Sequence, residues 1–209
     1  MKKLQLLILI FLLSISVCEA QKKIKREGMY SAYLYSVEGP EDYNLDSVNS
    51  VCEDPIIKID WDYAYSQIGF ELTNKSDQTI KILWDDAAYI SMSNESGRVF
   101  HKGVKYIDRE NSQPPTSIYK NTTLSDLISP TANTRYVSGQ YGGWVSSPLI
   151  PVPQGAFSNK IEYREDLLDK TMKVVLPIKI GDEVHEYIFS FKTEFVEKRN
   201  KKSSDDLYR

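Results

Sequence analysis

The chain has 209 residues, of which 26 are basic and 29 acidic, and its formal net charge at pH 7 is −3. This mildly acidic balance does not provide the basic face that nucleic-acid binding rewards, so we expect no nucleic acid among its partners. The length is sufficient for one domain with a hydrophobic core of ordinary size.

The first twenty residues have the pattern of a secretory signal peptide. A basic head precedes an apolar run from Leu4 to Val17, and small residues stand three and one positions before a possible cut after Ala20. The run is shorter than the roughly 20 residues of a membrane-spanning helix. We therefore expect export without a transmembrane span, to the periplasm, the medium or the outer membrane of a bacterium.

Cys18 leaves a second processing route open. A bacterial lipoprotein signal also ends in a short apolar run, and the cysteine that follows becomes the lipidated first residue. Ile15 and Ser16 suit that pattern, whereas Val17 is bulky where a small residue is usual. Cleavage after Ala20 would give a diffusible protein, and lipidation of Cys18 would give the same fold on a membrane anchor.

Residues 21–28 are basic and have little to bury, so we expect a flexible lead-in. Residues 29–196 form the expected single domain, and residues 197–209 are dense in charge and expected to be disordered. Cys52 is the one cysteine beyond the signal peptide, so no disulfide is expected and Cys52 is interpreted as a small buried residue.

Strand patterns dominate residues 29–196. Alternation of apolar and polar side chains over four to eight residues predicts half-buried strands. The segments with this pattern are 29–37, 55–65, 67–74, 79–84, 88–93, 97–107, 171–180 and 183–196. The only helical patterns are short, at 123–128 and 163–171. This predicts a mostly β fold, an antiparallel β-sandwich of immunoglobulin-like form, with a jelly roll or open barrel as the alternative.

Residues 108–159 have a different composition, crowded with Pro, Ser, Thr, Asn and Gly. A structureless stretch of this length is uncommon in a compact domain unless it is functional or packed by its own side chains. We expect a mostly irregular excursion that contains the short helix at 123–128 and strands at 135–139 and 147–152. The second of these strands should lie at an edge because it contains proline.

The segment from Ile68 to Ile90 has the clearest pattern. Its alternating apolar side chains predict a hairpin in which residues 68–72 pair with residues 80–84 around a polar turn at 74–78. Trp84 is then part of the core. Asp85 and Asp86 are interpreted as a turn at the end of a strand, with a loop calcium site as the alternative.

The part of this segment that reads FELTNKSDQTIKILW resembles a hairpin found in many exported bacterial immunoglobulin-like domains. Together with the signal peptide, the chain looks like an exported protein or lipoprotein of the Bacteroidetes type. The resemblance implies a sandwich that supports, spaces or binds, and it carries no catalytic residue onto this chain.

The common catalytic motifs do not occur in the sequence. It has no nucleophile elbow, zinc-binding helix, phosphate-binding loop or dinucleotide-binding motif, so we expect no cofactor. His101 and His185 are too few for a multi-histidine metal site. A hydrolase site assembled from separated residues, such as His101, Asp108 and a loop serine, remains an alternative.

The best functional candidate is a run of four residues in the excursion: Tyr141, Gly142, Gly143 and Trp144. The glycine pair frees the backbone, and the two rings are suited to stacking on a sugar or anchoring a protein. The alternative is that Trp144 packs beneath the excursion. We expect a non-enzymatic protein of the cell envelope that binds an unknown protein or glycan or serves a structural role. A lipid-anchored subunit of a surface assembly is a further alternative.

Overall fold

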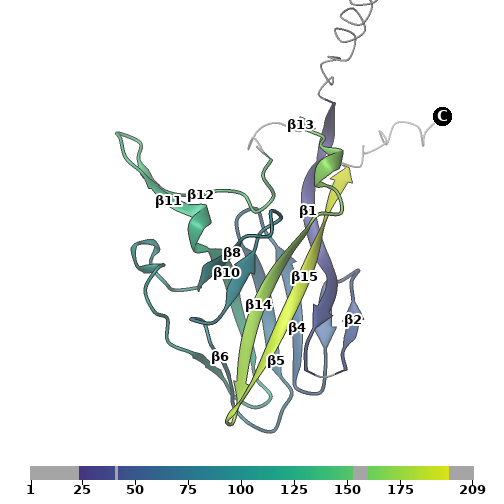
Figure 1. The fold of residues 1–209 in the computed structure, drawn as a ribbon, viewed down its shortest axis with the longest axis vertical. Helices are drawn as coiled ribbons and strands as arrows, with labels where there is room; N and C mark the ends of the chain where they lie inside the picture. Colours follow the sequence, from purple (N-terminus) through teal and green to yellow (C-terminus); the bar gives the residue numbers. More distant parts are fainter. Residues whose placement is uncertain (1–23, 41, 153–159, 198–209) are drawn as a thin grey trace, which may run out of the picture.

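The computed structural model describes residues 24–40, 42–152 and 160–197 (Figure 1). The strands are β1 (Lys25–Glu38), β2 (Asn44–Asp46), β3 (Val51–Glu53), β4 (Ile57–Tyr63), β5 (Ile68–Asn74), β6 (Ile80–Ile82), β7 (Ala88–Ile90), β8 (Ser96–His101), β9 (Thr116–Ile118), β10 (Thr123–Pro130), β11 (Thr134–Val137), β12 (Gly143–Ser146), β13 (Lys160–Glu162), β14 (Thr171–Ile180) and β15 (Glu183–Glu197). Single turns of 3-10 helix occur at η1 (Tyr106–Asp108), η2 (Thr131–Asn133) and η3 (Glu165–Leu167). Within this described part of the chain, no helix is long and apolar enough to cross a membrane.

The main sheet is antiparallel and continuous, in the order β13-β1-β15-β14-β7-β8-β10-β5-β4-β3-β2. The sheet curls at β14. One side of β14 pairs with β15, while the other side of β14 pairs with β7 near the start of β14 and with β6 near the end of β14. In Figure 1, β14 and β15 lie across β4 and β5. The curled sheet therefore forms two facing layers with the core between them.

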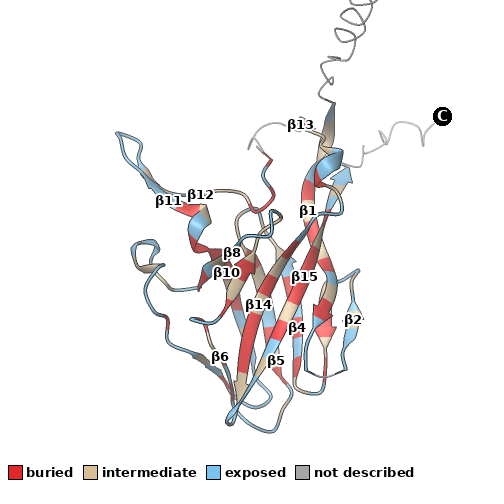
Figure 2. Cartoon of the chain, in the orientation of Figure 1, coloured by how far each residue is buried: buried red, intermediate tan, exposed pale blue. Residues whose placement is uncertain are grey.

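The core is built from the side chains that alternate inward on each strand (Figure 2). On β4, Trp61 is buried between two exposed neighbours, Asp60 and Asp62. The Trp61 ring lies 4.8 Å from the ring of Phe189 and 5.2 Å from that of Phe191, both on β15. These contacts join the two layers, and they confirm the predicted alternation of β4.

The predicted class is confirmed: the fold is mostly antiparallel β with only short helices. The strand expected at 171–180 has those bounds, and the one expected at 183–196 ends one residue later. The immunoglobulin-like form is not established by a single curled sheet. Short strands at 44–46 and 51–53 were not predicted, because three residues are too few to show a period.

The predicted hairpin between residues 68–72 and 80–84 is wrong. β5 pairs with β4 and β10, whereas β6 pairs with β14 and β9. The connection between β5 and β6 crosses from one layer to the other. The fully buried Asn74 holds this connection, because its side-chain amide donates to the carbonyls of Gln78, at 2.7 Å, and Ile118, at 3.0 Å. Alternation predicts which side chains face inward, but it does not identify the partner strand.

The predicted excursion is confirmed in part, because turns and irregular segments separate short strands in residues 108–152, while residues 153–159 lie outside the described residues. The helix expected within it is wrong. Residues 123–128 belong to β10, a central strand between β5 and β8, and not to a helix. A helix of six residues has little stability of its own, so pairing of residues 123–128 with β5 decides the conformation. The strand expected at 135–139 occurs as β11, but residues 147–152 form no strand. The helical pattern at 163–171 is reduced to the single turn η3.

The ends of the domain differ from the expected bounds. β1 begins at Lys25 and pairs with β13 and with the end of β15, so residues 25–28 are strand and not a flexible lead-in. Gly28 permits this pairing, because a Cβ there would lie 2.5 Å from the carbonyl oxygen of Val196. The signal peptide, residues 21–23 and residues 198–209 lie outside the described residues.

Candidate functional site

The four residues singled out in the sequence lie on a two-stranded hairpin that is separate from the main sheet. β11 and β12 pair antiparallel, with Tyr136 opposite Trp144 and Val137 opposite Gly143. The hairpin projects from the sandwich in Figure 1. Because an isolated two-stranded hairpin is only marginally stable in water, the contacts at its base determine how rigidly it is held.

Trp144 supplies the principal contact at that base. Its ring centroid lies 5.9 Å from the ring of Tyr106 and 5.6 Å from that of Tyr136. The guanidinium of Arg109 lies 5.0 Å from the Trp144 ring centroid, and its Nε donates to the Thr131 carbonyl at 3.3 Å. Trp144 thus packs as part of the base, and it is only half-buried.

Two hydrogen bonds close the open end of the hairpin. The hydroxyls of Thr134 and Ser146 lie 3.0 Å apart, and the Ser147 N–H donates to the Asn133 carbonyl at 2.7 Å. These bonds join the two strands to each other, whereas the contacts of Trp144 with Tyr106 and Arg109 hold the hairpin to η1.

The tip is a tight turn from Gly139 to Gly142. Gly139 has φ +132°, and the Gly142 N–H donates to the Gly139 carbonyl at 2.9 Å. A Cβ on Gly142 would lie 2.4 Å from the Val137 carbonyl oxygen, whereas a Cβ on Gly143 would meet nothing within 4 Å. Tyr141 stands at this tip with 94% of its surface exposed.

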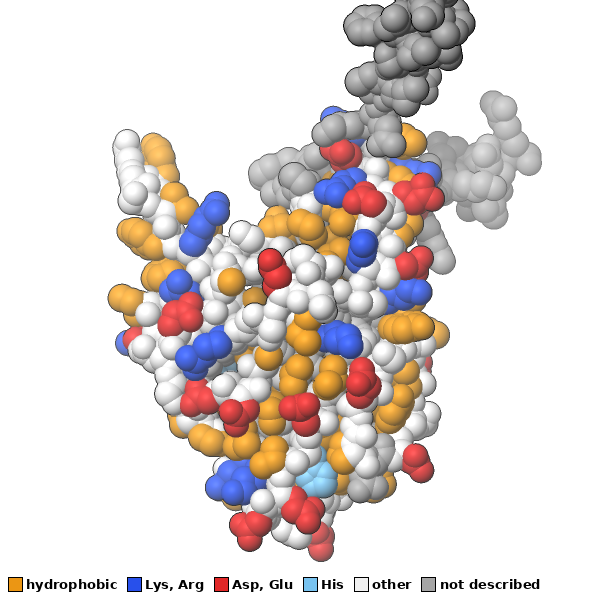
Figure 3. Space-filling model, in the orientation of Figure 1, with side chains coloured by type: hydrophobic (Ala, Val, Ile, Leu, Met, Phe, Trp, Pro, Cys, Tyr) orange, Lys and Arg blue, Asp and Glu red, His pale blue; other side chains and the backbone are white. Residues whose placement is uncertain are grey.

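Apolar side chains continue from the tip to the base. The exposed members, which we name the hairpin surface, are Tyr106, Ile107, Tyr136, Val137, Tyr141 and Val145. Figure 3 shows apolar side chains along the projecting hairpin. The sequence from 127 to 161 contains no Asp or Glu, although the chain as a whole is acidic. The register places Tyr136 with Trp144 on one face of the hairpin and Val137 and Val145 on the other, so apolar side chains are exposed on both faces.

His101 lies in a different arrangement, which is structural in character. Its Nδ1 is 3.1 Å from an Asp126 carboxylate oxygen, and its ring stacks on Trp84 at 4.2 Å. The other Asp126 oxygen accepts from the Lys102 N–H at 2.8 Å and the Leu127 N–H at 2.7 Å. This cluster joins the end of β8 to β10. Trp84 is 1% exposed, as predicted for a core residue.

The three groups that the sequence suggested for a hydrolase, His101, Asp108 and a loop serine, are not joined by hydrogen bonds within the described residues. Asp108 accepts a hydrogen bond from Asn111 at 3.1 Å, and the carboxylate beside His101 is that of Asp126. Among the residues that the structure describes, no serine hydroxyl forms a hydrogen bond with His101. His185 lies 3.7 Å from Glu183 on β15.

Asp85 is engaged by protein donors. It accepts hydrogen bonds from the Ser112 hydroxyl and from the Gln113 N–H, the latter at 3.0 Å, and it pairs with Arg98 at 3.0 Å. The Ser112 hydrogen bond, followed by that from Gln113, lowers the pKa of the Asp85 carboxyl. Asp85 thereby fixes the segment around Ser112 to the sandwich, as expected for a structural turn.

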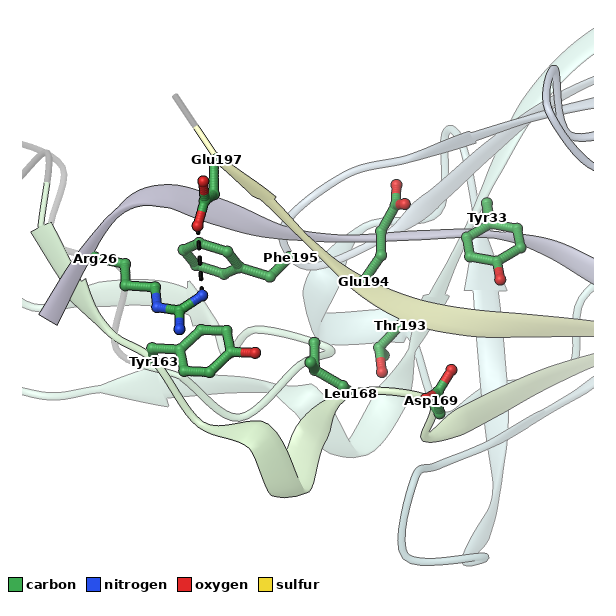
Figure 4. A pocket seen from close by; sticks show the side chains of 9 residues that line it. All are labelled: Arg26, Tyr33, Tyr163, Leu168, Asp169, Thr193, Glu194, Phe195 and Glu197. Carbon is green, nitrogen blue, oxygen red and sulfur yellow. Dashed lines mark hydrogen bonds and ion pairs between the residues drawn. The ribbon is translucent and has the colours of Figure 1, made fainter. Parts of the chain in front are cut away.

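A pocket of about 320 Å³ lies where β1 begins and β15 ends (Figure 4). The Arg26 guanidinium lies 3.8 Å from the centroid of the Tyr163 ring and 3.3 Å from the Glu197 carboxylate. The Tyr163 ring in turn packs edge-on against Phe195 at 5.2 Å. These contacts, together with the Tyr163 N–H that donates to the Ile24 carbonyl at 2.8 Å, fasten the start of β1.

Sequence reasoning missed Tyr106 and Arg109 as contacts of Trp144 at the hairpin base, and the exposed Ile107 beside them. They lie in or beside η1, where a strand through residue 107 was expected. The signal that could have found them is the Tyr-Ile pair placed directly before a charged, proline-containing stretch.

Comparison of the chain with protein-family models, with curated proteins and with solved structures found no match.

Proposed function

We propose that this chain is an exported, non-enzymatic protein of the bacterial cell envelope that binds a partner through the hairpin surface. The observation that supports this most strongly is Tyr141, which stands 94% exposed at the tip of a fastened hairpin. An exposed aromatic ring on a stiff support provides contact area at low entropic cost. Among the described residues, β11 and β12 pair only with each other and add no strand to the main sheet.

Export rests on the sequence. The apolar run up to Val17 and the small residues before position 21 support a signal peptide, and Cys18 supports a lipid anchor as its alternative. The resemblance to exported Bacteroidetes-type domains adds support for an envelope location. It does not extend to strand pairing, because β5 and β6 are not neighbours.

Binding is proposed in preference to catalysis. The carboxylate beside His101 also accepts two backbone N–H groups, and the ring stacks on a buried tryptophan, so the cluster holds β8 against β10. The hairpin surface has no comparable structural duty at its tip. Binding through the tip therefore explains the exposed ring of Tyr141, which a hydrolytic site at His101 would leave unexplained.

The test compares two exposed tyrosines in the chain without residues 1–20. Tyr141→Ser removes the ring at the tip, and Tyr119→Ser removes a ring that is 67% exposed and follows β9 at the opposite end of the sandwich. In co-sedimentation with a bacterial envelope fraction, Tyr141→Ser should bind about tenfold more weakly than wild type, the scale of a contact hot spot. Tyr119→Ser should bind like wild type. Equal binding by all three proteins would rule out the hairpin as the contact.

A further inference from the structure

We propose that the surface contacted by the hairpin is the lipid bilayer itself, with Tyr141 seated among the lipid headgroups. This inference rests on the proposed function, with the alternative processing route in which Cys18 is lipidated. The hairpin is then the second membrane contact of a protein whose first contact is its lipidated N-terminus.

The placement of the hairpin supports this occupant. In Figure 1, the tip of the β11–β12 hairpin reaches the level of β13, at the end of the sandwich where β1 begins and β15 ends. The turn between β14 and β15, at Gly181, lies at the opposite end. A lipid anchor attached before β1 therefore lies at the same end of the sandwich as the tip of the hairpin.

The length of the connection keeps that side close to the membrane. Cys18 precedes Ile24, the first described residue, by six positions in the sequence. Six residues span at most roughly 20 Å when fully extended. The start of β1 is itself fastened by pairing with β13 and by Arg26 on Tyr163. A lipid on Cys18 thus holds this end of the sandwich within a short, fixed reach of the bilayer.

The chemistry of the hairpin suits the headgroup region. Tyrosine rings and small aliphatic side chains favour the membrane interface, where the ring is buried and the hydroxyl stays hydrated. Asp and Glu, which anionic headgroups would repel, are absent from residues 127–161 of the sequence. Arg135 on β11 is the charged residue of the hairpin, and its sign favours contact with lipid phosphates.

The two contacts are expected to reinforce one another. A few exposed rings bind a bilayer weakly on their own, but tethering by the lipid raises their effective concentration at the surface. The narrow tip supports this use, because it can enter an interface that offers no complementary pocket.

The experiment places one fluorescent probe at each end of the sandwich. The chain from residue 21 carries a histidine tag ahead of it and is held on vesicles by a nickel-chelating lipid. The vesicles consist mostly of phosphatidylethanolamine, with a minor fraction of phosphatidylglycerol. Tyr141→Cys and Tyr119→Cys are each labelled with an environment-sensitive dye, and the buried Cys52 stays unlabelled. The probe at position 141 should shift to the blue and be quenched by lipid-borne quenchers, while the probe at 119 should not.

A second readout uses the unlabelled ring without the tether. Tyr141→Ser should weaken sedimentation with protein-free vesicles by roughly fivefold, and Tyr141→Trp should retain it, because partial burial of one ring contributes on this scale. A probe at 141 that stays in water, or equal shifts at both positions, would overturn the bilayer as the occupant. If Tyr141→Ser still loses binding to the envelope fraction, the proposed function survives and the contact is a protein or glycan.

Discussion

At the scale of single residues, the structure depends on a few buried polar groups that are fully satisfied. Asp54 is the clearest example, because one oxygen accepts from Tyr187 Oη at 2.6 Å and the other from the Ile56 and Ile57 N–H groups at 2.7 and 2.6 Å. A buried donor that loses its acceptor bears the full cost of desolvation. Asp54 therefore ties the turn before β4 to the centre of β15.

We expect Asp54→Ala to lower the free energy of unfolding by about 1–3 kcal/mol, since three donors lose their acceptor. Asp60→Ala is the matched control, because Asp60 is an exposed carboxylate on the adjoining strand. Urea unfolding followed by tryptophan fluorescence measures both. A loss at Asp54 no larger than that at Asp60 would show that the three hydrogen bonds to Asp54 add nothing to stability.

Cys52 provides a prediction with a pH dependence. Burial, followed by the nearby charges of Asp54 and Glu53, raises the pKa of the Cys52 thiol from 9.0 to about 12. The folded thiol stays protonated at pH 8, so a maleimide should label the native protein far more slowly than the urea-unfolded chain. Because the folded pKa is the higher one, the contribution to stability is complete below about pH 9 and is lost as the pH rises toward 12. Rapid native labelling at pH 8 would contradict the buried position.

Burial of individual side chains was predictable because it follows from local alternation. Cys52 and Trp84 are buried as expected, and Asp60 and Asp62 are exposed on either side of Trp61. The contact of His101 with Asp126 was not predictable, since it joins residues 25 positions apart on two paired strands. Spacing within one element carries no information on such a pair.

At the scale of elements, the hairpin owes its shape to one of its two adjacent glycines. We expect Gly142→Ala to distort the tip, because its Cβ would meet the Val137 carbonyl oxygen at 2.4 Å, and Gly143→Ala to be tolerated. Overpacking of this kind costs roughly 1–3 kcal/mol. Amide exchange within residues 134–146 should accelerate about tenfold or more in the first variant alone, because local opening becomes easier.

The two variants control for one another, since each adds a single methyl group to neighbouring positions. Exchange in β4 and β15 should be unchanged in both, because the core makes no contact with the tip. Similar exchange of residues 134–146 in the two variants would show that neither glycine is required by the turn.

A strand was predictable where apolar and polar side chains alternate along its own residues. The long strands β14 and β15 were found at nearly their full length, since alternation runs through both. β10 was mistaken for a helix because Thr123 to Ile128 has too few residues to show either period. The partners of β5 and β6 were wrong for another reason: the connection that the buried Asn74 holds crosses between layers, and a polar turn sequence does not distinguish this from a hairpin.

At the scale of the whole molecule, one end of the sandwich carries the start of β1, the end of β15 and the projecting hairpin. This arrangement arises from pairing over long sequence distances, so no sequence pattern could predict it. The sequence did predict that Tyr141 and Trp144 belong to a distinctive segment. It left open whether Trp144 is presented together with Tyr141 or packs beneath the excursion.

Attachment through Cys18 gives a prediction for the intact cell. With a lipid on Cys18, wild type should sediment with membranes and Cys18→Ala should move to the soluble fraction, because the hairpin alone binds weakly. Unchanged fractionation of Cys18→Ala would mean that Cys18 is not the anchor.

The central claim is that the hairpin surface is where this protein meets its envelope partner, and footprinting of the wild-type chain tests it most directly. Hydroxyl radicals oxidise exposed tyrosines, and the rates at Tyr141 and Tyr119 are compared with the chain free and bound to envelope fractions. The proposed contact predicts that Tyr141 becomes several-fold less reactive on binding, the expected result for a ring removed from water, while Tyr119 reacts at its free rate. A Tyr141 rate that is unchanged in the fully bound protein would contradict the claim.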